Sequence, residues 1–148
     1  PDLGGVSFRG VAAVSVTSRT VNCAEVAVTL TADPVAYGAA RTVALSAGSN
    51  AVRVGGSFPT RPVLRLAASS ASAVPSVALL DTGESLALLS APGHDKAVVL
   101  DCGERTATVA GAASRVTMQS DWFEMPPGDC TLLLSGAAGT LEYRERWA

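Results

Sequence analysis

Apolar and polar residues alternate along most of this 148-residue chain, and apolar residues nowhere recur at helical spacing for three clean turns. Strict alternation over a few residues predicts strands that bury one face. Seven runs rich in β-branched and aliphatic side chains carry the pattern, at residues 26–30, 63–67, 76–80, 86–90, 97–101, 106–110 and 131–135.

Turn-forming residues separate these runs. Gly, Pro, Asp and Asn clusters recur about every 8 to 14 residues, the spacing expected of an antiparallel sandwich or barrel. We therefore predict an all-β fold, an antiparallel β-sandwich. Residues 32–34 are expected to form a turn, residues 86–111 a meander, and residues 126–148 a closing β-hairpin whose last strand carries Arg144, Arg146 and Trp147.

Composition supports a folded domain and excludes several function classes. Hydrophobic residues make up 48% of the chain and charged residues 16%, which argues against disorder. The net charge of −2, without any basic run, predicts no nucleic-acid partner. No uninterrupted apolar stretch is long enough for a membrane span, and no leader pattern is present. Because the first residue is Pro1, we expect an N-terminal part to be missing.

The three cysteines, Cys23, Cys102 and Cys130, cannot all pair with one another. An odd number without a C-x-x-C motif supports neither a disulfide framework nor a zinc site. We expect buried free thiols that pack as small apolar groups. A single Cys102–Cys130 bridge is the alternative.

Catalytic chemistry has little support in the sequence. His94 is the single histidine, and no G-x-S-x-G motif positions a serine for it. The acidic residues lack the spacing of a dedicated calcium loop, and the glycines lack a phosphate-binding motif. We therefore predict no enzyme, no metal and no cofactor, and place His94 at a loop tip.

Aromatic and arginine residues near the C-terminus are the candidate contact residues. In an extended stretch, Trp122 and Phe123 would point to opposite faces, so that one could stack on a sugar or enter a neighbouring subunit. The alternative is that Trp122 closes one end of the core and Phe123 lies on a loop. The predicted protein-interface or glycan-contact set is Trp122, Phe123, Tyr143, Arg144, Arg146 and Trp147.

Several segments together resemble one family, the siphovirus-type tail component, which is the distal tail protein of phages with long non-contractile tails. The similar positions run in order along residues 22–148: Asp33-Pro34, Tyr37-Gly38, Asn50, Gly55-Gly56, Pro59, Pro62, Asp101, Asp121, Phe123, Pro127-Gly128, Tyr143-Arg144 and Trp147. One departure is Asp129-Cys130, where the family commonly has Asn after Pro-Gly.

The resemblance implies a galectin-like, jelly-roll-like sandwich at residues 31–148, with residues 1–30 as the end of an N-terminal ring domain or strands shared with it. It implies a structural baseplate hub at the virion tail tip, assembled in the bacterial cytoplasm as a homo-hexamer. The implied partners are the tail tube, the tape measure, and a tail-associated fibre or lysin. A lectin-like module that binds host cell-wall glycan is the alternative function.

Overall fold

The computed structural model describes residues 7–148, except for the side chain of Asp33. Residues 1–6, where the expected ring-domain segment begins, lie outside the described part. The described chain forms strands and no helix, which confirms the all-β prediction. The strands are β1 (Ser7–Arg19), β2 (Ala24–Leu45), β3 (Gly48–Val54), β4 (Val63–Ala68), β5 (Ser76–Leu79), β6 (Glu84–Ala87), β7 (Ala97–Asp101), β8 (Thr106–Val109), β9 (Ala112–Ala113), β10 (Gly128–Ser135) and β11 (Ala137–Trp147).

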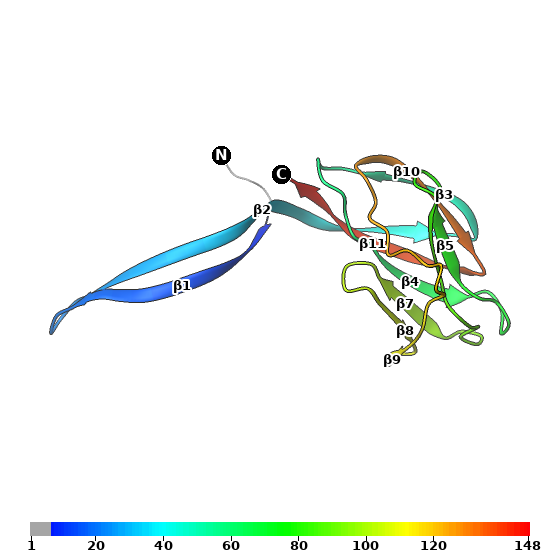
Figure 1. The fold of residues 1–148 in the computed structure, drawn as a ribbon, viewed down its shortest axis with the longest axis horizontal. Helices are drawn as coiled ribbons and strands as arrows, with labels where there is room; N and C mark the ends of the chain where they lie inside the picture. Colours follow the sequence, from blue (N-terminus) through cyan, green and yellow to red (C-terminus); the bar gives the residue numbers. More distant parts are fainter. Residues whose placement is uncertain (1–6) are drawn as a thin grey trace.

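Two antiparallel sheets make up the fold. The larger sheet has the strand order β1-β2-β11-β4-β7-β8-β9, and the smaller one β3-β10-β5-β6. The two sheets pack on each other at one end of the molecule (Figure 1). This arrangement confirms the antiparallel β-sandwich, whereas the galectin-like assignment stays a prediction.

The core lies between the two sheets and follows the alternation in the sequence. Leu64 and Leu66 of β4 point inward from the larger sheet, and Leu132 and Leu134 of β10 meet them from the smaller one. Every second side chain points into the core because successive residues of a strand point to opposite faces of the sheet. The loop before β10 adds Phe123 and Met125, both fully buried.

A long hairpin projects from the sandwich. It consists of β1 and of residues 24–35 in β2, and we call it the arm (Figure 1). Every residue of β1 is exposed. The remainder of β2 pairs with β11, from Ala36 to Leu45, so one strand belongs both to the arm and to the sandwich.

The turn predicted at residues 32–34 is wrong, because β2 runs through it without a break. The pairing of β1 with β2 shifts register here, from Phe8–Ala36 to Gly10–Ala32. Such an irregularity accommodates Pro34, which has no N–H to donate to a partner strand. The Asp-Pro pair therefore marks a bulge inside a strand.

Two connections predicted within a sheet instead cross between sheets. The expected closing hairpin is wrong, because β10 pairs with β3 and β5, while β11 pairs with β2 and β4. Gly136, at φ 68°, makes the turn between them. The meander predicted for residues 86–111 is correct only for β7 and β8, since β6 pairs with β5 in the smaller sheet. A glycine turn between two alternating runs is compatible both with a hairpin and with a crossing from one sheet to the other. The sequence pattern therefore did not distinguish these two connections.

Candidate interaction site at the root of the arm

The arm has one apolar face. Direct cross-strand partners share a face of a two-stranded ribbon. Val14 lies opposite Val28, and Val16 opposite Val26, with Leu30 next to them opposite Ala12. Their side chains are 49% to 75% exposed. The other face is mixed: Thr31, Thr29 and Ser15 lie opposite Val11, Ala13 and Ala27. The arm therefore has one wholly apolar face, and this face is exposed in the described monomer.

The arm also offers unsatisfied backbone. β1 is the edge strand of the larger sheet. Edge strands present rows of unpaired N–H and C=O groups that can pair with another chain. A hairpin of only two strands is marginally stable in water unless it packs against something else. The exposed apolar face and the free edge together indicate that the arm is built to be covered.

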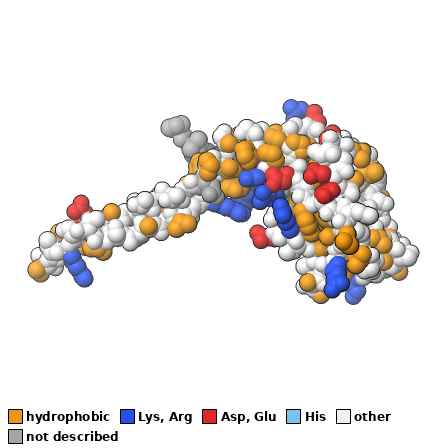
Figure 2. Space-filling view, viewed as in Figure 1, with side chains coloured by type: hydrophobic (Ala, Val, Ile, Leu, Met, Phe, Trp, Pro, Cys, Tyr) orange, Lys and Arg blue, Asp and Glu red, His pale blue; other side chains and the backbone are white. Residues whose placement is uncertain are grey.

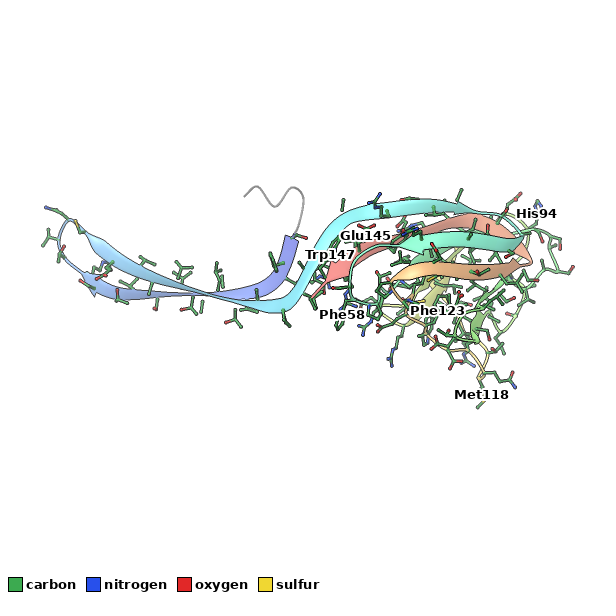
Figure 3. All side chains as sticks on the ribbon, turned by 90° about the horizontal axis from the view of Figure 1, so that it is seen from above. Phe58, His94, Met118, Phe123, Glu145 and Trp147 are labelled. Carbon is green, nitrogen blue, oxygen red and sulfur yellow. The ribbon has the colours of Figure 1, made fainter. Side chains whose placement is uncertain are left out.

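Contacts from β11 fix the root of the arm, the region where the arm meets the sandwich. Trp147 packs directly on the backbone of Gly38 in β2, where a β-carbon would approach its ring to 2.8 Å. Glu145 forms an ion pair with Arg41 at 3.3 Å. Figure 3 shows Trp147 and Glu145 side by side at this junction. The aromatic and charged ending therefore anchors the C-terminal strand to the arm-bearing strand.

The segment after β3 closes over the same end of β11. The N–H groups of Ser57 and Phe58 both donate to the carbonyl of Arg146, at 2.9 and 3.1 Å. Gly56 makes this approach possible, because it has φ 92° and a β-carbon there would clash with the Arg146 backbone. The Arg146 guanidinium donates in turn to the Pro59 carbonyl at 2.7 Å. Residues 55–59 thus hold Arg146 in place from both sides.

A pocket of about 450 Å³ lies at the root. Five segments of the chain line it: β1, β2, the start of β4 with the residues before it, the end of β7 with the turn that follows, and β11. The lining residues are Arg9, Tyr37, Ala40, Thr60, Arg61, Val63, Asp101, Gly103, Glu104, Glu142, Tyr143, Arg144 and Arg146. Figure 2 shows the basic side chains gathered where the arm leaves the sandwich. The pocket is rich in arginine on the side of β1 and β11.

The charges in this pocket are unevenly compensated. Arg61 pairs with Glu124 at 2.6 Å, and Glu142 pairs with Arg65 at 3.0 Å. Asp101 uses one carboxylate oxygen to cap the N–H groups of Gly103 and Glu104. The guanidinium groups of Arg9 and Arg146 lie over the ring of Tyr37, at 5.2 and 5.6 Å from its centroid. Among the described side chains, Arg9, Arg144 and Arg146 have no carboxylate partner.

The structure brings together four of the six predicted contact residues. Tyr143, Arg144, Arg146 and Trp147 all lie at the root, where Arg144 is exposed and Arg146 and Trp147 are half-buried. Tyr143 is buried and donates its hydroxyl to the Arg53 carbonyl at 2.9 Å, which ties the two sheets together. Burial raises the pKa of this hydroxyl, and nearby Glu145 adds to the effect. Whether these residues meet a partner stays a prediction.

The other two predicted contact residues belong to the core. Phe123 lies in the irregular segment before β10, as the alternative predicted, but its side chain is fully buried and is not a surface contact. Trp122 packs against the core and is partly buried, in agreement with the alternative that it closes one end. Adjacent aromatic residues in an irregular segment need not alternate between faces, which is why the strand-based expectation failed here. Sequence reasoning missed Arg9, Tyr37 and Phe58, since only the fold brings these separate segments together.

The remaining candidate groups do not form a chemical site. His94 is exposed at a loop and contacts Asp95 at 2.8 Å; it lies at the end of the sandwich away from the arm (Figure 3). Cys102 and Cys130 are buried free thiols, as expected, whereas Cys23 is exposed, which corrects the expectation for that residue. Among the described side chains, no group of three or more His, Cys, Asp or Glu is placed to hold a metal ion. No helix in residues 7–148 could cross a membrane.

Comparison with known proteins places this architecture in a family. The family model for the siphovirus-type tail component, C-terminal domain, matches residues 55–147, which is more than half of the chain. The chain belongs to this family. The match begins after β3, so the similarity noted at Asp33, Pro34, Tyr37 and Gly38 stays a prediction. The tail-component match includes β11 and its arginines, but not the arm.

A solved structure matches the fold of this tail component over nearly its whole length. It is the crystal structure of SPP1 Dit (gp 19.1), described as a paradigm of the hub adsorption apparatus in phages that infect Gram-positive bacteria. The TM-score is 0.78 at 18% identity, covering 99% of this chain and 63% of that one. This chain therefore spans less than two-thirds of that protein, and the likeness shows that the arm and the sandwich recur as one fold. No curated protein matches the sequence.

Proposed function

We propose that this chain is a structural hub protein at the tip of a long, non-contractile phage tail or of a phage-derived particle. In this proposal it joins the tail tube to the fibre or receptor-binding components and catalyses no reaction. The family match supports a tail role. The single observation that carries the assembly role is the exposed apolar face of the arm, because large apolar surfaces on a folded protein mark sites of association.

The arm is the element that joins copies of the chain. Its free edge can accept another strand, and its apolar face can pack on a neighbouring polypeptide. A contact between an arm and a different surface of the next copy is head-to-tail, and such contacts form a ring when the rotation between copies closes. We propose a homo-hexameric ring, the number of copies that the family resemblance implies. Residues 1–30 then belong to the ring-forming part and residues 31–148 to the sandwich that faces other tail proteins.

The decisive experiment charges one face of the arm at a time in the full-length chain. The test variant carries Val14→Asp and Val28→Asp, a cross-strand pair on the apolar face. The matched control carries Ala13→Asp and Thr29→Asp, the neighbouring pair on the opposite face, with the same added charge. Mass from light scattering and negative-stain images report the assembly, and circular dichroism reports the fold of the sandwich.

We expect six-fold rings for the unmodified chain and for the control, and monomers for the test variant. Melting of the sandwich should be similar in all three, because the four substituted residues are exposed and none belongs to the core cluster. If the test variant keeps the mass of the unmodified chain, the arm does not mediate assembly. An unmodified chain that stays monomeric at all concentrations would contradict the ring itself.

A further inference from the structure

The pocket at the root contains a buried donor without an acceptor. The Nε–H group of Arg146 is shielded from solvent and has no hydrogen-bond partner among the described residues. Another N–H of the same guanidinium donates to Pro59, and the segment 55–59 holds the backbone. Buried polar groups are almost always paired, so this donor calls for a partner that is not among the described residues.

The surroundings define what that partner must be. Arg144 and Arg146 line the same pocket, and neither has a carboxylate partner among the described side chains. The guanidinium of Arg146 lies over the rings of Tyr37 and Phe58, at 5.6 and 5.2 Å, and one of its N–H groups donates to Pro59, so only its remaining N–H groups are left for a ligand. A guanidinium edge matches the two oxygens of a carboxylate. This chemistry favours an anion that offers two oxygens to one guanidinium edge.

We propose that this pocket receives the carboxylate of an Asp or Glu side chain from a neighbouring polypeptide in the tail tip. The carboxylate accepts hydrogen bonds from Arg146 and Arg144. This inference rests on the proposed function, because it names the chemistry by which the root of the arm contacts its partner.

Two features favour a polypeptide over a free anion or a sugar. The pocket adjoins β1, whose edge is free to pair with another strand, so a segment lying there would carry its side chains past Arg9 and into the pocket. The opposite wall carries Asp101 and Glu104. An isolated anion would be repelled by that wall, whereas a peptide can place its carboxylate against the arginines and its N–H groups toward the acids.

The test uses the full-length chain carrying Val14→Asp and Val28→Asp, which leaves the pocket intact whether or not the arm mediates assembly. The probe is the capped peptide acetyl-Gly-Glu-Gly-amide, and the control probe is acetyl-Gly-Gln-Gly-amide, which has the same size without the charge. Nitrogen–proton NMR spectra follow the Arg146 Nε–H signal during titration at low salt. We expect a saturable downfield shift with the Glu peptide, with a Kd of about 1 mM, and none with the Gln peptide.

Variants of the pocket check the assignment. Arg144→Gln should weaken binding of the Glu peptide about tenfold, the usual effect of losing one charge-assisted hydrogen bond. Arg53→Gln is the control, because Arg53 is an exposed arginine on β3 that does not line the pocket. It should leave the affinity unchanged. Raising the salt concentration should weaken binding of the Glu peptide, as expected for a contact between charges.

Three results would overturn the proposal. The first is an unmoved Arg146 Nε–H signal at all concentrations of the Glu peptide. The second is an equal response to the Glu and Gln peptides. The third is tighter binding of glucuronate or inorganic phosphate than of the Glu peptide, which would assign the pocket to a sugar acid or a free anion. Since the assembly test depends on the arm substitutions and this one on the pocket, either proposal can fail without the other.

Discussion

Leu132 and Leu133 are neighbours in β10 and allow a direct test of the sandwich. Leu132 is completely buried between the sheets, whereas Leu133 points outward and is 41% exposed. Replacing each with Ala removes the same atoms from opposite faces of one strand. Because β10 is a central strand, between β3 and β5, neither substitution lies at a frayed edge.

The expected costs differ severalfold. Removing a buried leucine leaves a cavity as well as losing the transfer free energy, so Leu132→Ala should lower the free energy of unfolding by about 3 to 4 kcal/mol. Leu133→Ala leaves no cavity and should cost below about 1 kcal/mol. For a chain of this length, these values correspond to roughly 10 °C and roughly 2 °C in melting temperature.

Urea denaturation followed by circular dichroism at the strand signal measures both variants. The slope against urea should stay constant, so that midpoints compare stability directly. Equal losses for the two variants, or a larger loss for Leu133→Ala, would show that the inward face of β10 is assigned wrongly. In that case the core between the sheets, and the crossing from β10 to β11, would have to be rebuilt.

Three further predictions follow from buried and exposed groups. Cys23 should react with a thiol reagent within minutes in the native protein, giving one equivalent, while Cys102 and Cys130 react only on unfolding. Desolvation raises the pKa of Cys102 from 9.0 to about 12, so the unfolded thiol ionises first. Stability from this group is complete below pH 9 and falls between pH 9 and 12, by about 4 kcal/mol in total; Cys102→Ala should flatten that alkaline loss in urea titrations. Tyr143→Phe removes the hydrogen bond to Arg53 and should cost about 1 kcal/mol in thermal melts, whereas an unchanged melting temperature would show that this bond contributes nothing.

Several strands of the sandwich were predictable from alternation, whereas β1, β3 and β9 fall outside the predicted runs. The run at residues 131–135 lies within β10, and its buried residues are Leu132 and Leu134, as period-two alternation requires. The runs at residues 63–67 and 97–101 match β4 and β7 almost to the residue. In each case β-branched and aliphatic residues flanked by turn formers left no competing structure.

Sheet membership was beyond the sequence pattern. Alternation fixes which side chains point inward, but not which strand lies alongside, and β10 and β11 separate into different sheets across a single glycine turn. Pro34 misled for a related reason. Proline usually ends a strand, but beside a free edge it can be absorbed as a bulge. The length of the arm therefore depends on the pairing of β2 with β1, and no local sequence pattern predicts that pairing.

The candidate site shows the same division. Arg144, Arg146 and Trp147 could be singled out because arginine and aromatic residues concentrate at interfaces. The pocket around them could not be predicted, because it is lined by segments as far apart in the sequence as Arg9 and Arg146. Phe123 shows the opposite error, since an aromatic residue in a polar stretch was taken for a contact and proved to be core.

The distribution of unsatisfied surface explains why the arm and the pocket belong to one system. Among residues 7–148, eight of the fourteen exposed large hydrophobic residues lie within residues 8–30. The orphaned donor of Arg146 lies at the root of the same arm. Because β2 continues from the arm into the sandwich, with Trp147 and Arg41–Glu145 fixing the junction, a partner that covers the arm also sets the geometry of the pocket. A neighbour bound only by apolar contact could slide along a regular ribbon, whereas one carboxylate in a charged pocket fixes its position. In the proposed assembly, the arm therefore supplies buried area and the pocket sets the register of the partner.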